Sequence, residues 1–112
     1  MDRKVKHQHG GLAGGRWEKL SLAEQMANIG SEVGRALNWR NKGNSEYCLS
    51  AVTRALELVD LSLACGRSYP ALKELARLRE ALVDFFLGSN VYGSSELLWR
   101  AYFDHFNYLA RK

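Results

Sequence analysis

Glycine-containing breaks divide most of this 112-residue sequence into four segments that repeat apolar residues at a helical period. The breaks lie at Gly43, at Gly66 and from Gly88 to Ser94. Apolar residues that recur every three or four positions indicate one buried side of an α-helix, and links this short place consecutive helices antiparallel. The sequence therefore predicts an all-α fold, an up-down-up-down antiparallel four-helix bundle, with helices near 22–42, 45–65, 70–87 and 95–111.

The first predicted helix has a clear start and one apolar side. Ser21 followed by Glu24 forms a capping box, in which each residue satisfies a backbone N–H of the other. The apolar side then consists of Leu22, Met26, Ile29, Val33 and Leu37. Gly43 is expected to supply the left-handed residue that ends this helix near Lys42.

A stripe of small residues runs beside that apolar side: Ala23, Ala27, Gly30 and Gly34. A glycine inside a helix costs about 1 kcal/mol relative to alanine, so two of them imply a compensating contact. That contact is the close approach of another helix, either within the bundle or from a second subunit. Gly30 and Gly34 are therefore candidate interface residues.

The remaining helix ends also have recognisable signals. Asn44 is expected to cap the second helix, and Ser94 the fourth. Pro70 suits the first turn of the third helix, where its missing N–H would have no intrahelical partner.

The second predicted helix is apolar around most of its circumference. Its polar residues fall on one narrow stripe: Ser50, Thr53, Arg54, Glu57 and Asp60. A helix of this kind is buried on several sides, which is more covering than three short helices easily provide. The excess apolar surface therefore favours a homodimer.

Carboxylates on the second and third predicted helices could face one another beside arginines. The carboxylates are Glu57, Asp60, Glu80 and Asp84, and the arginines are Arg54, Arg77 and Arg79. One interpretation is a layer of salt bridges that fixes the register of the helices. The other is a polar pocket or a cation site.

Positive charge is concentrated at the N-terminus. The formal net charge is +4; residues 1–16 contribute +3, and the other 96 residues, with 12 basic and 11 acidic side chains, contribute +1. Residues 1–16 are rich in glycine and have no apolar periodicity, so they are predicted to be a disordered basic tail, and the bundle is assigned to 17–112. Such a tail can hold nucleic acid loosely.

Apolar runs and cysteines favour a cytoplasmic protein without membrane association. No uncharged apolar run approaches the roughly 18 to 20 residues of a membrane span, and no secretory signal is recognisable. Cys48 and Cys65 lie roughly 25 Å apart on one predicted helix, too far for a disulfide. Two unpaired cysteines agree with a reducing compartment.

The familiar catalytic and metal-binding patterns of helical bundles are missing from the sequence. Outside the predicted tail His105 is the one histidine, and no Glu-x-x-His pair of a di-iron site occurs. The two separated cysteines suggest no zinc site, so no metal and no cofactor are expected. The leading interpretation is a non-enzymatic helical-bundle protein that acts by association, as a homodimer, with a protein or RNA as a candidate further partner.

The segment from Arg100 to His105, with the sequence RAYFDH, resembles the Arg-x-x-x-x-His motif of HEPN domains. These are small helical bundles, many of them metal-independent ribonucleases that act as dimers, often as toxins. The resemblance implies that two copies of Arg100 and His105 line a cleft at a dimer interface. His105 would transfer protons at the ribose 2′-hydroxyl, and Arg100 would stabilise charge on the phosphorane. In architecture alone the chain is also similar to small uncharacterised bacterial four-helix proteins, including those encoded in intervening sequences of ribosomal RNA.

The alternative interpretation of His105 is structural. It places the imidazole, partly buried and hydrogen-bonded, on the helix side that carries Leu98, Tyr102 and Tyr108. Residues five apart on a straight helix are displaced by about 140° around its axis. We therefore expect that Arg100 and His105 do not converge on one open cleft.

Overall fold

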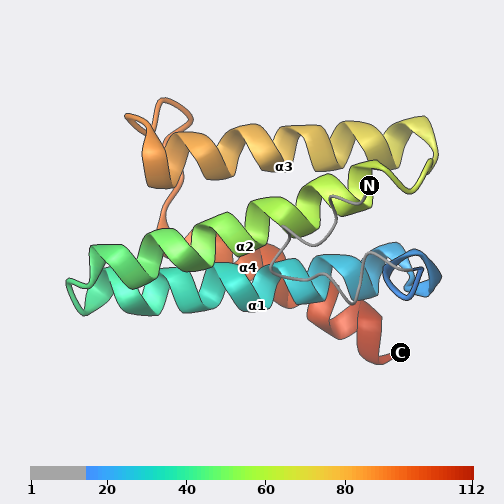
Figure 1. The fold of residues 1–112 in the computed structure, drawn as a ribbon, viewed down its shortest axis with the longest axis horizontal. Coiled ribbons are helices and arrows are strands. Elements are labelled where there is room, and N and C mark those ends of the chain that lie inside the picture. Colours follow the sequence, from blue (N-terminus) through green and yellow to red (C-terminus); the bar gives the residue numbers. More distant parts are fainter. Residues whose placement is uncertain (1–14) are drawn as a thin grey trace, which may run out of the picture.

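The structure, a computed structural model, describes residues 15–112. A short 3-10 turn, η3 (Trp17–Lys19), precedes α1 (Leu22–Asn41), α2 (Ser45–Leu63), α3 (Tyr69–Leu87) and α4 (Glu96–Arg111). The chain runs up and down through the four α-helices in turn (Figure 1), and residues 15–112 contain no strand. The predicted all-α four-helix bundle is confirmed. The predicted tail lies outside the described residues, except for its last two.

The predicted start and end of α1 are confirmed in atomic detail. The Ser21 hydroxyl accepts a hydrogen bond from the Glu24 N–H at 3.1 Å, and the Glu24 carboxylate accepts one from the Ser21 N–H at 2.8 Å. Gly43 has a φ of +77°, as a left-handed residue after a helix requires. The Asn44 side chain then accepts a hydrogen bond from the Tyr47 N–H and caps α2.

The cap of α4 is one residue later than predicted. Ser95, and not Ser94, accepts a hydrogen bond from the Leu98 N–H at 3.2 Å. Ser94 instead exchanges two hydrogen bonds with the side chain of Asn90. These bonds hold the last part of the α3–α4 link in a closed loop, so the helix begins only after it.

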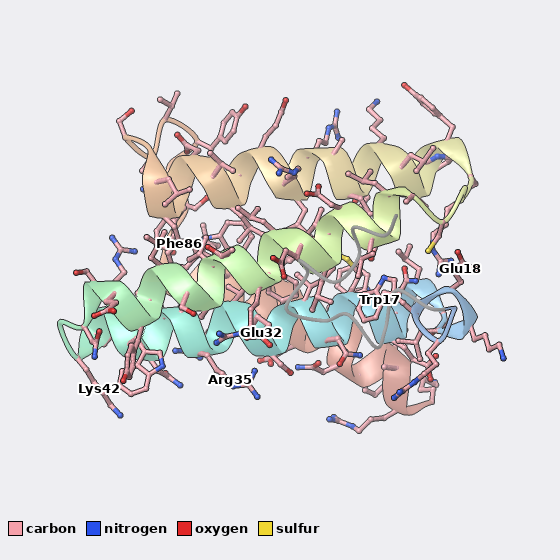
Figure 2. The ribbon with its side chains drawn as sticks, viewed as in Figure 1. Trp17, Glu18, Glu32, Arg35, Lys42 and Phe86 are labelled. Carbon is pink, nitrogen blue, oxygen red and sulfur yellow. The ribbon has the colours of Figure 1, made fainter. Side chains whose placement is uncertain are left out.

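α2 lies between α1 and α3 (Figure 1), and this position explains its apolar circumference. Its buried residues are Ala51, Val52, Ala55, Leu58, Val59 and Ser62. Phe86 lies between α3 and α2 (Figure 2) and packs against the buried cluster that contains Ala51 and Val52. The apolar surface of α2 is therefore largely covered within one chain, and it no longer argues for a dimer.

A hydrogen-bonded cluster holds the start of the bundle together. Trp17, labelled in Figure 2, is 2% exposed and donates its indole N–H to the Ser62 hydroxyl at 3.0 Å. Gln25 donates to the Trp17 carbonyl, and Arg67 donates to the Gln25 side chain and to the Leu20 carbonyl. Trp17 lies outside the helical apolar periods, so the sequence does not indicate that it is buried.

Asp60 and Arg79 form a salt bridge of the predicted layer, between α2 and α3. Asp60 accepts two hydrogen bonds from Arg79, at 2.7 and 3.2 Å, but both side chains are about half exposed. Exposed pairs of this kind contribute at most about 1 kcal/mol. Arg54 turns the other way and pairs with Glu32 of α1 at 3.1 Å. Asp84 accepts from two backbone N–H groups of the α3–α4 link.

The bundle is least closely packed between α3 and α4. α1 packs closely against α2 and α4, and α2 against α3, but the backbones of α3 and α4 approach each other much less. Large side chains bridge this gap. The rings of Phe85 and Trp99 lie 6.1 Å apart, and the Tyr102 hydroxyl donates a hydrogen bond to Glu74.

Candidate association surface

The outward side of α4 is apolar. Leu97 is 78% exposed, Leu98 59%, Tyr108 56% and Leu109 40%. At 3.6 residues per turn these four positions, together with the exposed Ala101 and His105, lie within an arc of about 120°. We call these six residues the outer face. The opposite side of α4 contributes Trp99 and Phe103 to the core, so α4 is apolar on both sides.

A groove between α3 and α4 continues this surface. Its volume is about 470 Å³. Its lining consists of Glu74, Arg77, Leu78, Ala81, Ser94, Leu98, Trp99 and Tyr102. Leu98 belongs to both the groove and the outer face. The two features therefore form one apolar surface, which is the candidate site.

The polar groups of the groove are already paired in part. Burial raises the pKa of the Tyr102 phenol well above its ordinary value near 10, and the hydrogen bond to the Glu74 carboxylate raises the pKa further. Tyr102 thus stays protonated and locks Glu74 against α4. The indole nitrogen of Trp99 is buried and has no hydrogen-bond partner among residues 15–112. The groove therefore combines apolar lining from Leu78, Ala81 and Leu98 with one buried N–H that no described residue pairs.

Both candidate interface glycines lie against α4 of the same chain. A Cβ built at Gly30 would lie 2.7 Å from Cγ and 2.8 Å from Cβ of Phe103. A Cβ built at Gly34 would meet only the Arg100 guanidinium, at 3.9 Å. The close helix approach implied by the glycine stripe therefore occurs within the bundle, at Gly30. Phe103 covers that position, so Gly30 gives no support for contact with a second subunit.

Arg100 and His105 are directed to different surroundings. Arg100 forms a salt bridge with Glu96 at 2.9 Å, donates to the Asn38 side chain at 3.0 Å, and so faces α1. It lines a pocket of about 170 Å³ between α1 and α4, and His105 does not line it. His105 is exposed, and its ring meets that of Phe106 edge-on at 5.3 Å. The expectation that His105 is partly buried was wrong, because nothing among the described residues covers the outer face.

Metal binding and thiol reactivity depend on other side chains of the described residues. Across 15–112 no three His, Cys, Asp or Glu side chains gather closely enough to hold a metal ion. Cys48 lines a small cavity with Arg40, but burial raises the pKa of its thiol and outweighs the opposing effect of Arg40. A raised pKa makes a thiol less reactive.

Within the same residues, no helix combines the length and apolarity needed to cross a membrane. Comparisons with protein-family models, curated proteins and solved structures find no match to this chain.

Proposed function

We propose that this protein is a non-enzymatic association module that forms a homodimer by burying the outer face of α4. The observation that carries the proposal is the run of large apolar side chains on that face. Exposed apolar surface on a small protein usually marks a binding surface when it is contiguous. The four large residues of the outer face lie on one helix and adjoin the α3–α4 groove.

The free energy available from this surface is of the right size for association. Complete burial of a leucine-sized side chain contributes about 2 kcal/mol. Scaled by the exposed fractions of the four large residues, the outer face offers about 4–5 kcal/mol per chain. Two chains together then offset much of the roughly 4 to 15 kcal/mol that association costs. The adjoining groove adds further apolar area to the contact.

A HEPN-like ribonuclease has weaker support. Such an enzyme would need Arg100 and His105 on one cleft, but five positions on α4 turn them about 140° apart. Arg100 would also have to leave both Glu96 and Asn38. Association requires no such rearrangement.

Light scattering on the purified full chain tests the proposal. We expect about twice the monomer mass of 12.7 kDa at micromolar concentration. The variant Leu98→Glu/Tyr108→Glu should be monomeric and still helical by circular dichroism. The matched control Tyr69→Glu/Val91→Glu changes two residues that are 73% and 80% exposed away from α4, and should stay dimeric. A monomeric wild type, or a dimer that survives the changes on α4, would refute the proposal.

A further inference from the structure

We infer that the two copies pair through antiparallel α4 helices, around a two-fold axis at the level of Phe103. This inference rests on the proposed function, because it specifies the partner and the register of the same surface. In a two-fold antiparallel pair, a residue lies opposite the one equally far beyond the axis in the other copy. The arrangement can therefore be tested against the order of residues along the outer face.

The outer face is symmetric about Phe103 in the size and polarity of its residues. Residues equally distant from this position are Leu97 and Leu109, Leu98 and Tyr108, and Ala101 and His105. Near the middle of the face, Leu98 thus lies opposite the large Tyr108 of the second copy. The small Ala101 lies opposite the larger imidazole of the second copy. Leu97 and Leu109 lie at equal levels on the two edges of the contact and cover its flanks.

A parallel pair would pack this face less evenly. It would set Ala101 against Ala101 and His105 against His105. Two small side chains would then meet at one level of the contact and two larger ones at the next. Helix interfaces fill space best when small residues oppose large ones.

The dipole of α4 favours the antiparallel arrangement as well. Antiparallel pairing places the positive N-terminal end of one helix beside the negative C-terminal end of the other. Parallel pairing would bring like ends of the two dipoles together.

The α3–α4 groove gives the arrangement a second contact. Leu98 lines the groove, and the residue opposite it is Tyr108 of the second copy. The phenol ring of that residue, 56% exposed in the single chain, is therefore placed at the groove beside Leu78 and Ala81. Because the two-fold axis repeats every contact, each copy fills the groove of the other.

Cysteine cross-linking tests the register. An equimolar mixture of the full-length Leu98→Cys and Tyr108→Cys variants should form an intermolecular disulfide between positions 98 and 108 on mild oxidation. Peptide mapping distinguishes this link from any made by Cys48 or Cys65. Leu98→Cys alone should not link through position 98. Its two copies would lie about 15 Å apart along the helices, and a disulfide needs Cα atoms within about 7 Å.

A charge-pairing experiment covers the case in which cysteine weakens the dimer. Leu98→Lys and Tyr108→Glu should each lose the dimer alone and regain it when mixed, because positions 98 and 108 are opposite. A link between two copies of position 98, or regained association between Leu98→Lys and Leu98→Glu, would show parallel pairing and overturn the inference. The proposed homodimer would survive either result. A dimer in which positions 98 and 108 do not link also overturns the inference, whereas a wild type that is monomeric overturns both proposals.

Discussion

Gly30→Ala and Gly34→Ala make the same chemical change one helical turn apart, in different surroundings. Each replaces a glycine inside α1 with a better helix former, which is worth up to about 1 kcal/mol. The added methyl at position 34 would lie 3.9 Å from a guanidinium nitrogen, which is an ordinary contact. At position 30 it would lie 2.7 to 2.8 Å from three atoms of Phe103. Comfortable carbon contacts are about 3.5–4 Å.

The clash at position 30 has no inexpensive relief. One of the three atoms is Cβ of Phe103, which every residue except glycine carries, so a different rotamer or a smaller side chain at 103 does not remove it. α4 must move away from α1 by several tenths of an ångström or more. Overpacking of this kind costs about 1–3 kcal/mol. Because both variants share the gain in helix propensity, Gly30→Ala should be less stable than Gly34→Ala by about the same 1–3 kcal/mol.

Urea denaturation followed by circular dichroism measures this difference. Both variants should be compared with wild type at one protein concentration, because the stability of a dimer depends on concentration. Gly34→Ala should equal or exceed wild type, and Gly30→Ala should fall below Gly34→Ala. Adding Phe103→Leu to Gly30→Ala should not restore the lost stability. Equal stability of the two alanine variants would refute the close contact between α1 and α4.

Three further predictions concern single contacts. Ser62→Ala should lower the free energy of unfolding by about 1–3 kcal/mol, since it leaves the buried indole N–H of Trp17 unpaired; an unchanged urea midpoint would contradict this. The raised pKa of Tyr102 means that its stabilising hydrogen bond is present below pH 10 and is lost as the pH rises through that raised value. Tyr102 should therefore stay protonated near pH 10, and an ultraviolet titration should count the same number of ionising tyrosines in folded wild type and in Tyr102→Phe. A smaller number in the variant would show that Tyr102 ionises normally. Purified protein and His105→Ala should both leave RNA intact, and cleavage by wild type that the variant loses would favour the ribonuclease.

The helices could be predicted from the sequence because their ends are encoded locally. The Ser21 capping box, Gly43 and Pro70 act within one turn of the chain, so no tertiary information was needed to interpret them. The error at Ser94 arose because its preference for a cap competes with a loop that Asn90 closes. That competition depends on residues outside the helix, and the helical period does not reveal it.

The candidate site was harder to predict, because an apolar period does not say what covers it. α2 and α4 both look suited to burial, but α2 lies between two neighbours, whereas only one side of α4 is covered. The sequence therefore pointed to α2 and the glycines as evidence of a dimer. The structure explains α2 and Gly30 by contacts between helices of one chain, and Trp17 and Gln25 are recognised as core residues only from the structure.

The contact between Gly30 and Phe103 also helps to explain how α4 presents its outer face. α4 lies deeply against α1 because Gly30 has no side chain, and Trp99 and Phe103 anchor its inner side in the core. A helix fixed in this way keeps its outer side in a constant orientation, so little ordering entropy is lost when a partner binds. Arg100 is also held at the α1 side by Glu96 and Asn38, which keeps its charge away from the outer face. The orientation of the outer face is thus a consequence of how the inner side packs, and the proposed association needs no group beyond the side chains that this face presents.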